Sequence, residues 1–341
     1  MKKQILITGG TGYIGSHTAV EFLQKGYEVF IIDNLSNSSI ETLDGIEKIC
    51  GIRPHFDKFD LCDKQKLDEY FTKNTGISSI IHFAASKAVG ESVEKPLLYY
   101  HNNLVSLINL LEIISLKNHI SFVFSSSCTV YGQPEILPVS ENSPIKPAES
   151  PYGNTKQISE EIIRDSILAN PGICALALRY FNPVGAHPSA HIGELPLGIP
   201  NNLVPFITQT AAGLREELSV FGNDYNTIDG TCVRDYIHVV DLAKAHVVAA
   251  ERLMEKRNKK NFEIFNLGTG LGYTVLQAIK SFEKISGQKL KYKIVGRRAG
   301  DIEKVYSDTK FANEELGWTA THSIDDMMLS AWKWEKKIRN L

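Results

Sequence analysis

The sequence predicts an α/β protein with a doubly wound parallel sheet and a second, smaller mixed α/β domain. Three observations support this fold class. Short apolar runs alternate with longer helical patterns through the first 180 residues. The first three strong runs are nearly continuous Ile, Val and Phe, as in strands that are covered on both faces. A glycine-rich turn follows the first run, and the length of 341 residues suits about two domains.

The expected strands are, in chain order, Gln4 to Thr8, Glu28 to Asp33, the weaker His55 to Phe59, Ser79 to Phe83, Ile120 to Ser125 and Ile173 to Tyr180. The expected helices between them are Tyr13 to Gln24, Lys64 to Lys73, Leu97 to Leu116 and Pro151 to Ala169. This alternation of strand and helix is typical of a parallel sheet with helices on both faces.

After Tyr180 the pattern changes, and Asn182 to Pro205 is expected to form long loops, which usually serve a ligand. A helix from Asp241 to Met254 and a strand from Phe262 to Leu267 again indicate a βα unit. We therefore expect a first domain of residues 1–180, to which the segment of about 236–268 returns. We expect residues 181–341 to form the second domain, which is discontinuous because of that segment.

The expected helix at 97–116 is apolar around most of its circumference, from Leu104 to Ile114. A helix that packs only on a sheet needs a single apolar stripe. Two interpretations remain open: a deeply buried helix, or a helix that meets a second subunit. The second interpretation predicts a homodimer through the helices near 97–116 and 151–169.

Composition excludes several classes of protein. The net charge of -2 gives no electrostatic signature for nucleic acid or for an anionic membrane. The five cysteines form no C-x-x-C pair, and the ten histidines form no H-E-x-x-H motif, so no zinc site, other metal or disulfide framework is expected. Neither a signal peptide nor an apolar stretch of membrane-spanning length is evident. We expect a cytoplasmic protein that binds small molecules.

The glycine-rich turn runs from Thr8 to Gly15 as TGGTGYIG. Glycines here allow a tight turn and a close approach to a pyrophosphate, while the N-terminus of the following helix favours phosphate. Asp33 stands 18 residues beyond Gly15, at the end of the second strand. An acid there accepts from an adenosine ribose and repels a 2′-phosphate. Because Asn34 to Ile40 contains no Lys or Arg, NAD is favoured over NADP.

A second set of residues is typical of a catalytic site. Ser125, Ser126 and Ser127 close the expected strand that begins at Ile120, at the sheet edge where ligands bind. Tyr152 and Lys156 stand four residues apart on a predicted helix and share one face. A lysine ammonium and a nicotinamide cation would lower the pKa of the tyrosine toward neutral pH. The constellation predicts Tyr152 as the base, with Ser127 bridging it to a substrate hydroxyl.

Longer motifs extend from end to end of the chain. They are TGGTGYIGSH, DNLSNS, KAVGES, SSSCTVYG, SPYGNTK, RYFNPVGAHPS, GIPNNL, FGNDY, DGTCVRDYIHV and RRAGD, between Thr8 and Asp301. In these motifs the sequence resembles the extended short-chain dehydrogenase/reductase family with its Rossmann-type domain, and within that family the UDP-hexose 4-epimerases. The resemblance implies reversible inversion at C4 of a UDP-hexose: transient oxidation by tightly bound NAD, rotation of the 4-keto sugar, and return of the hydride.

The resemblance also implies further site residues. Those matched to the NAD site, in addition to Lys156, are Gly9, Gly12, Tyr13, Ile14, Gly15, Asp33, Asn34, Asn37, Ser38, Asp60, Leu61, Phe83, Ala84, Ala85, Lys87, Asn102, Ser125, Tyr152 and Tyr180. Those matched to the UDP-sugar site are Lys87, Ser127, Tyr152, Phe181, Asn182, Asn202, Leu203, Phe221, Arg234, Arg298, Asp301 and Val305. Arg234 and Arg298 are the expected diphosphate clamp, a role that suits guanidinium groups. The structural alternatives are an Arg234–Asp235 ion pair and a solvated Arg297–Arg298 turn.

Departures from the family pattern refine the expectation. Cys128 replaces the usual alanine after the catalytic serine, and Asn154-Thr155 replaces the usual Lys-Ser. At the position of Val305, family members that are restricted to glucose resemble one another in carrying a bulky tyrosine. The smaller valine leaves room for an acetamido group on the sugar. UDP-GlcNAc and UDP-GalNAc are therefore additional expected substrates. Two competing functions are a nucleotide-sugar 4,6-dehydratase, which needs an added acid and base where Cys128-Thr129 stand, and a non-catalytic NAD-sensing module.

Overall fold

The computed structural model describes residues 2–117, 119–298 and 301–341 of the chain. Its larger part is a seven-stranded parallel sheet in the order β10-β6-β5-β4-β1-β2-β3. These strands are β1 (Gln4–Thr8), β2 (Glu28–Asp33), β3 (His55–Lys58), β4 (Ile77–His82), β5 (Ser121–Ser127), β6 (Ala175–Tyr180) and β10 (Phe262–Leu267). The strand order reverses between β1 and β4, which is where ligands bind in such sheets.

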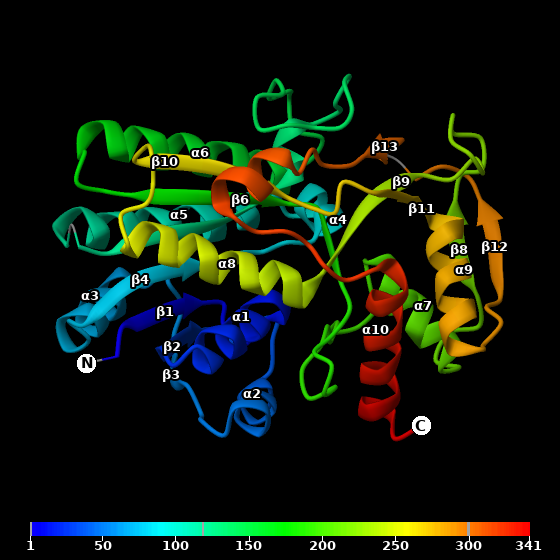
Figure 1. Ribbon diagram of the computed structural model, residues 1–341, viewed down its shortest axis with the longest axis horizontal. Helices are drawn as coiled ribbons and strands as arrows, with labels where there is room; N and C mark the ends of the chain where they lie inside the picture. Colours follow the sequence, from blue (N-terminus) through cyan, green and yellow to red (C-terminus); the bar gives the residue numbers. More distant parts are fainter. Residues whose placement is uncertain (1, 118, 299–300) are drawn as a thin grey trace.

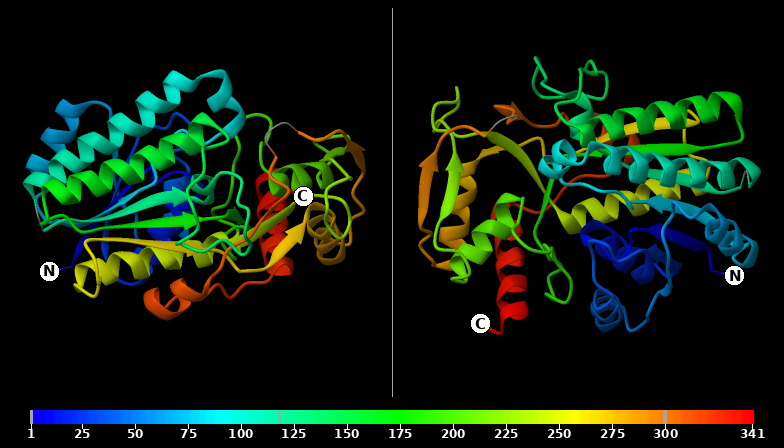
Figure 2. Two further views of the ribbon diagram at one scale, coloured as in Figure 1. Left: turned by 90° about the horizontal axis from the view of Figure 1, so that it is seen from above. Right: turned by 180° about the vertical axis from the view of Figure 1, so that it is seen from behind.

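Helices cover both faces of this sheet (Figure 1). On one face lie α1 (Tyr13–Gln24), α2 (Thr42–Cys50) and α8 (Val239–Met254). On the other lie α3 (Lys64–Lys73), α5 (Pro96–Leu116) and α6 (Pro151–Ala169), with α5 and α6 side by side (Figure 2, left). The short helices α4 (Val89–Glu94) and η1 (Cys128–Tyr131) follow β4 and β5. The doubly wound fold class is thus confirmed.

A smaller second domain lies beyond the carboxyl ends of the central strands (Figure 1). Its strands are β7 (Asn182–Val184), β8 (Leu218–Phe221), β9 (Val233–His238), β11 (Gly272–Thr274), β12 (Tyr292–Val295) and β13 (Lys304–Val305). Its helices are α7 (Leu203–Ala211), α9 (Val275–Ser286), the π-helix η2 (Ala312–Leu316) and α10 (Ile324–Arg339), of which η2 packs back against β10 and α8. An apolar cluster of α7, α9 and α10 residues forms the core of this domain.

Several predicted boundaries were displaced. Strand β4 begins at Ile77 and ends at His82, one residue before the expected Phe83. Strand β5 begins at Ser121 and continues through Ser127, two residues beyond the expected Ser125, so all three serines lie within the strand and pair with β6. The expected loop region 182–205 contains the short strand β7, which pairs with β9, and the start of α7 at Leu203. A three-residue strand is too short to show a sequence period.

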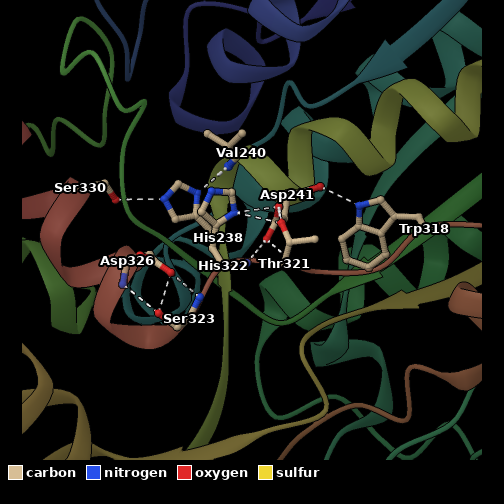
Figure 3. A network of polar contacts seen from close by, with 9 residues as sticks. All are labelled: His238, Val240, Asp241, Trp318, Thr321, His322, Ser323, Asp326 and Ser330. Carbon is tan, nitrogen blue, oxygen red and sulfur yellow. Dashed lines mark hydrogen bonds and ion pairs between the residues drawn. The ribbon is translucent and has the colours of Figure 1, made fainter.

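The residues that open α8 and α10 hold the two domains together (Figure 3). On α8, Asp241 accepts hydrogen bonds from the backbone N–H groups of Thr321 and His322 at 2.8 and 2.9 Å, and its oxygens also contact both side chains. His238 accepts from the Val240 N–H at 3.1 Å through Nδ1 and contacts Ser330 Oγ of α10 at 3.0 Å through Nε2. Burial disfavours the charged Asp241 carboxyl, but these bonds outweigh burial and lower its pKa. This junction sets how the second domain sits against the sheet.

Among the described residues, no helix combines the length and apolar character needed to cross a membrane. The same residues contain no group of three or more His, Cys, Asp or Glu side chains suited to hold a metal ion. All five cysteines are free.

Candidate active site

The parallel sheet brings most of the predicted cofactor residues to one edge. Gly9 follows β1, Asp33 ends β2, Phe83 follows β4, Ser127 ends β5 and Tyr180 ends β6. The registers place Thr8 opposite both Ile32 and His82, and Ser127 opposite Tyr180. Segments that are far apart in sequence therefore meet at one edge.

The glycine turn is tightly built. Gly9 has φ of +70°, and a Cβ there would come within 2.8 Å of the Ala84 nitrogen. A Cβ on Gly15 would clash with the Gly9 carbonyl oxygen. Gly12 opens α1 as its N-cap with no side-chain cap, and no acidic residue lies in the first turn. The N–H groups that α1 cannot pair internally are thus free of local carboxylates and suit a pyrophosphate.

Asp33 lies beside this turn. Its carboxylate accepts from the Thr11 N–H at 3.2 Å, the Leu35 N–H at 2.9 Å and the Ser38 hydroxyl at 3.1 Å. The Thr11 and Ser38 hydroxyls contact each other at 2.8 Å. The carboxylate therefore ties the glycine turn to the segment after β2, in the position where a dinucleotide ribose is bound in this type of fold.

The remaining predicted cofactor residues show a range of environments. Asn34 donates to Asp60 at 3.0 Å, and the Leu61 carbonyl accepts from Asn109 at 2.8 Å. Asn102 donates to Ser86 and Asn103. Ser125 contacts the Tyr180 hydroxyl at 2.6 Å. Asn37 is exposed, while Tyr13, Ile14, Ala84 and Ala85 are half-buried.

The predicted catalytic side chains converge where α6 meets β5. Ser150 caps α6 by accepting from the Gly153 N–H at 3.1 Å, and Pro151 occupies the first turn. The helix then places Tyr152 and Lys156 on its buried face, where they are 9% and 4% exposed. Lys156 Nζ donates to the Ser125 carbonyl at 2.7 Å and lies 5.9 Å from the centre of the Tyr152 ring. Ser127, 6% exposed, accepts from the Thr129 N–H at 3.2 Å.

Electrostatics in this corner differ from the sequence-based expectation. Burial raises the pKa of Tyr152, Tyr180 and Cys128 add to that rise, and the contact with Ser127 acts in the opposite direction. Burial lowers the pKa of Lys156 to about 8, although Glu160 acts to raise it. The side chains of the protein alone therefore do not lower the pKa of Tyr152, because the effect of burial is the largest. The expected lowering also depends on the positive charge of a bound nicotinamide.

The predicted substrate residues gather at the border of the second domain. Asp301 lies between two arginines: Arg298 donates to it at 2.7 and 3.2 Å, and Arg234 lies 3.8 Å away. The Arg298 guanidinium is also 5.5 Å from the centre of the exposed Phe221 ring. Val305 is buried on β13 with Phe181, beside the half-buried Cys128. Asn182 is on β7, and Asn202 precedes Leu203 at the start of α7.

The Arg234–Asp235 ion pair is not formed, whereas the Arg297 and Arg298 side chains are 48% and 57% exposed, as in a solvated turn. Asp235 accepts from Thr269, Gly270 and Ser307 rather than from Arg234. Arg297 pairs with Asp224 at 2.7 Å and lies over the Tyr225 ring, whereas Arg298 turns toward Asp301 and Phe221. The two adjacent arginines are thus divided between a structural contact and the candidate site.

Sequence reasoning missed Glu194. Its carboxylate accepts from Asn202 at 2.7 Å and lies 3.9 Å from Lys87 Nζ, so it joins two predicted substrate residues that stand 115 positions apart. Burial raises its pKa, and Lys87 and Asn202 oppose that rise. A lone acid in a Gly- and Pro-rich loop gives no signal of its own. Only its position between the RYFNPVGAHPS and GIPNNL motifs could have drawn attention to it.

Comparison with known proteins identifies relatives over almost the whole chain. The family model described as GDP-mannose 4,6 dehydratase matches residues 6–330. The UDP-glucose 4-epimerase of Yersinia enterocolitica is 51% identical over 332 residues, which are 97% of each chain. The crystal structure of UDP-glucose 4-epimerase from Bifidobacterium longum, in complex with NAD⁺ and UDP, has a TM-score of 0.93 and 46% identity, covering 99% of both chains. The UDP-Glc/GlcNAc 4-epimerase of Campylobacter jejuni has a TM-score of 0.84 and 38% identity, covering 98% of this chain and 99% of the other.

Proposed function

The chain belongs to the UDP-glucose 4-epimerase family, and we propose that it interconverts UDP-glucose and UDP-galactose with NAD as its cofactor. The observation that carries the proposal is the buried corner of Ser127, Tyr152 and Lys156 at the carboxyl edge of the sheet, where only β4 separates β5 from β1 and its glycine turn. This corner offers a proton acceptor, a fixed cation and a hydroxyl bridge next to a dinucleotide site.

Each catalytic residue has a distinct task in this proposal. Tyr152 accepts the proton of the sugar 4-hydroxyl and later returns it. Lys156, held by the Ser125 carbonyl, provides the positive charge that favours the phenolate. Ser127 bridges the phenol and the substrate hydroxyl. When bound, NAD supplies a hydride acceptor that returns the hydride, so the reaction has no net oxidation.

The cofactor residues are proposed on the fit of the sheet edge to a dinucleotide. The free N–H groups of α1 would hold the pyrophosphate, and Asp33 the adenosine ribose. Segments after β2, β3 and β4, together with the ends of β5 and β6, would line the rest of the site. These segments hold Asn34, Asn37, Ser38, Asp60, Leu61, Phe83, Ala84, Ala85, Lys87, Asn102, Ser125 and Tyr180.

For the substrate, we assign Arg234 and Arg298 to the diphosphate, because guanidinium groups bind such oxygens in pairs. Their shared partner Asp301 holds both in place and would contact the nucleotide ribose. Phe221 would lie against the uracil. Asn182 and Leu203 would add UDP contacts, while Lys87, Phe181 and Asn202 lie toward the sugar.

We further propose that UDP-GlcNAc and UDP-GalNAc are substrates. Val305 is a small side chain in an apolar group with Val130, Tyr131 and Phe181, close to the catalytic strand. The similarity to the Campylobacter jejuni UDP-Glc/GlcNAc 4-epimerase supports this wider range. A tyrosine in place of Val305 would occupy the space of an acetamido group.

One experiment tests both proposals. Purified protein is incubated with UDP-galactose and, separately, with UDP-GalNAc, without added NAD, and the sugars are then analysed. Formation of both C4 epimers supports the proposals and shows that NAD copurifies. Turnover of UDP-galactose alone would refute the N-acetyl proposal. Inactivity with and without added NAD would refute the epimerase assignment. The Val305→Tyr variant should retain UDP-galactose turnover and lose UDP-GalNAc turnover.

A 4,6-dehydratase is the second candidate, since the matching family model carries that description. Dehydration needs an additional acid and base at the sugar, and Cys128 and Thr129 follow Ser127 where dehydratases carry carboxylates. Burial raises the pKa of Cys128 to about 12, so the thiol is a poor substitute. Mass analysis of the same incubations separates the candidates, because only a dehydratase product lacks the mass of one water.

The proposal also covers the oligomeric state, the domain boundaries and the cellular location of the protein. We propose a homodimer through α5 and α6, on which Leu97, Ile108, Leu116 and Leu168 are exposed at 40% to 82%. Ile108→Glu should then convert a dimer into a monomer in light scattering.

The pairing of β10 with β6 supports a first domain of residues 1–180 rejoined by about 236–268, with the rest of 181–341 forming the UDP-sugar domain. Five free cysteines support a cytoplasmic location.

A further inference from the structure

A third ionisable side chain lies on the catalytic face of α6. Glu160 follows Lys156 by four residues, as Lys156 follows Tyr152, so the three share one side of the helix. Glu160 is 4% exposed. Its carboxylate accepts from Arg179 through Nε at 2.9 Å and Nη2 at 2.5 Å, a bidentate and almost completely buried ion pair. A buried pair of this kind holds its partners in one geometry.

The ion pair connects the catalytic helix to the catalytic strand. Glu160 Oε1 also accepts from the Ser126 hydroxyl at 2.6 Å, and Ser126 is the register partner of Arg179. One turn earlier, Lys156 donates to the Ser125 carbonyl. Helix α6 is thus attached to β5 at the two residues that directly precede Ser127.

The same network also holds the chain after Ser127. Arg179 Nη1 donates to the Tyr131 hydroxyl at 2.9 Å, and its guanidinium lies 4.8 Å from the centre of the Tyr131 ring. Tyr131 ends η1 and donates to Asn266 of β10 at 2.7 Å. Ser127 therefore lies between two anchored points, Ser126 and Tyr131, that meet at one guanidinium–carboxylate pair.

We propose that Glu160, together with Arg179, is a positioning residue for the epimerase reaction: the pair fixes Ser127 relative to Tyr152 and Lys156 by joining α6 to the chain on both sides of Ser127. This inference rests on the proposed function. Geometry of this kind matters because a displacement of about 1 Å can reduce a rate about a hundredfold.

The charge of Glu160 has a second effect. Burial lowers the pKa of Lys156 to about 8, and Glu160 opposes this lowering. Removal of the negative charge should lower that pKa further, so that Lys156 loses its proton at lower pH. The other titratable groups that act on Tyr152 or Lys156 are His82 from β4, Tyr99 from α5, Cys128 from η1 and Tyr180 from β6, while Arg179 from β6 contacts Glu160. Burial lowers the pKa of His82 to about 3, which keeps it neutral here.

The chain contains a matched control. Arg252 of α8 and Glu263 of β10 form a second buried bidentate pair at 2.7 and 2.9 Å, with side chains 6% and 8% exposed. This pair also joins a helix to a strand of the same sheet, but Arg252 otherwise contacts the Glu315 carbonyl and none of the catalytic residues. A purely structural role predicts the same behaviour for both pairs.

The experiment compares Glu160→Gln with Glu263→Gln in the holoenzyme. For Glu160→Gln we expect kcat for UDP-galactose to fall about ten- to a hundredfold, KM to stay within about twofold, and the basic limb of the pH–kcat profile to move to lower pH. Glu263→Gln should change stability and leave kcat and the profile unchanged. Equal kinetic effects of both substitutions, or an unchanged profile in Glu160→Gln, would overturn the proposal.

Two further measurements keep the proposal testable. If Glu160→Gln does not fold, the double variant Glu160→Met with Arg179→Met replaces the pair by apolar groups, which such cores often tolerate. Wild-type kcat and pH profile in that variant would refute the role. NMR of ¹⁵N-labelled lysines, with Lys156→Met for assignment, follows the titration of Lys156 directly. An inactive wild-type protein would refute the proposed function, whereas an unshifted Lys156 titration in Glu160→Gln would refute this inference by itself.

Discussion

The proposed catalytic corner and the proposed UDP clamp of this chain differ in how they are built. The corner lies within the parallel sheet, and Ser127, Tyr152 and Lys156 are all less than 10% exposed. The clamp lies on chain segments of the second domain, and its Arg298 side chain is 57% exposed. In the corner, partners come from neighbouring strands and one helix. In the clamp, Arg234 and Arg298 share Asp301 as a partner, and Arg234 also donates to the Val233 carbonyl at 2.9 Å. The difference is between a fully enclosed corner and a proposed clamp whose Arg298 side chain is open to solvent.

The largest expected effect comes from breaking the corner. Tyr152→Phe removes the proposed proton acceptor and should lower kcat by about 10² to 10⁴ while NAD remains bound. Steady-state turnover of UDP-galactose and the absorbance of bound cofactor measure the two quantities. Tyr70→Phe is the control, because Tyr70 is equally buried on α3 and its hydroxyl has no partner among the described residues. Comparable losses in both variants would contradict the assignment.

A smaller effect, of a different kind, is expected at the clamp. Arg298→Ala removes charge-assisted bonds to the diphosphate and should raise KM for UDP-galactose about ten- to a hundredfold, with a much smaller change in kcat. Arg297→Ala is the matched control, since the neighbouring arginine pairs with Asp224 instead. A fall in kcat at constant KM in Arg298→Ala would contradict the proposal that Arg298 acts in substrate binding and not in the chemical step.

The junction between the two regions should affect stability more than activity. Asp241→Asn replaces a carboxylate that accepts from Thr321 and His322, and should lower the free energy of unfolding by about 2 kcal/mol at pH 7. Because the folded pKa of Asp241 is lowered, its contribution is complete above the ordinary carboxyl pKa of about 3.9 and is lost as pH falls through the folded value.

Urea unfolding at pH 7 and at pH 3 checks this prediction. The difference between wild type and Asp241→Asn should shrink at the lower pH. Asp68→Asn is the control, because Asp68 forms only an exposed pair with Lys64 and should cost a few tenths of a kcal/mol. A difference that persists unchanged at pH 3 would show that the carboxylate charge has no part in the junction.

The smallest effect is expected at Cys128, although it lies beside the catalytic serine. Burial raises the pKa of its thiol to about 12, so at pH 8 only about one molecule in ten thousand carries a thiolate. Cys128→Ala should therefore change kcat by less than about twofold, and iodoacetamide at pH 8 should inactivate the enzyme only slowly. Rapid inactivation that Cys128→Ala abolishes would show that the corner is open and reactive.

A contrast between local and long-range contacts also explains which features could be predicted from the sequence. Elements of the larger domain have local signals: β1, α1, β2, α3 and α6 have the predicted bounds. Ser150 and Pro151 mark the start of α6 in the sequence itself. Contacts across long separations have no such signal. Examples are Glu160 with Arg179, Glu194 with Lys87 and Asn202, and Asp301 with Arg234.

Some local signals in the second domain were present but unused. The capping boxes Thr274–Gln277 and Ser323–Asp326 mark the starts of α9 and α10. In the first domain, helix α2 was also not predicted, although it ends at Gly51 in the left-handed conformation, a common helix stop. The π-helix η2 and the two-residue strand β13 are set by tertiary packing, and no period in so short a segment predicts them.

The position of β10 at the edge of the main sheet has a consequence for synthesis on the ribosome. Strand β6 ends at residue 180, but its outer neighbour β10 begins only at residue 262. At about 5 to 20 residues per second, roughly 4 to 16 s pass between the two strands. Through that interval the nascent chain carries an apolar strand with an unpaired edge, which is an aggregation hazard. Chaperone dependence during translation should therefore be concentrated in this window and end when β10 leaves the exit tunnel.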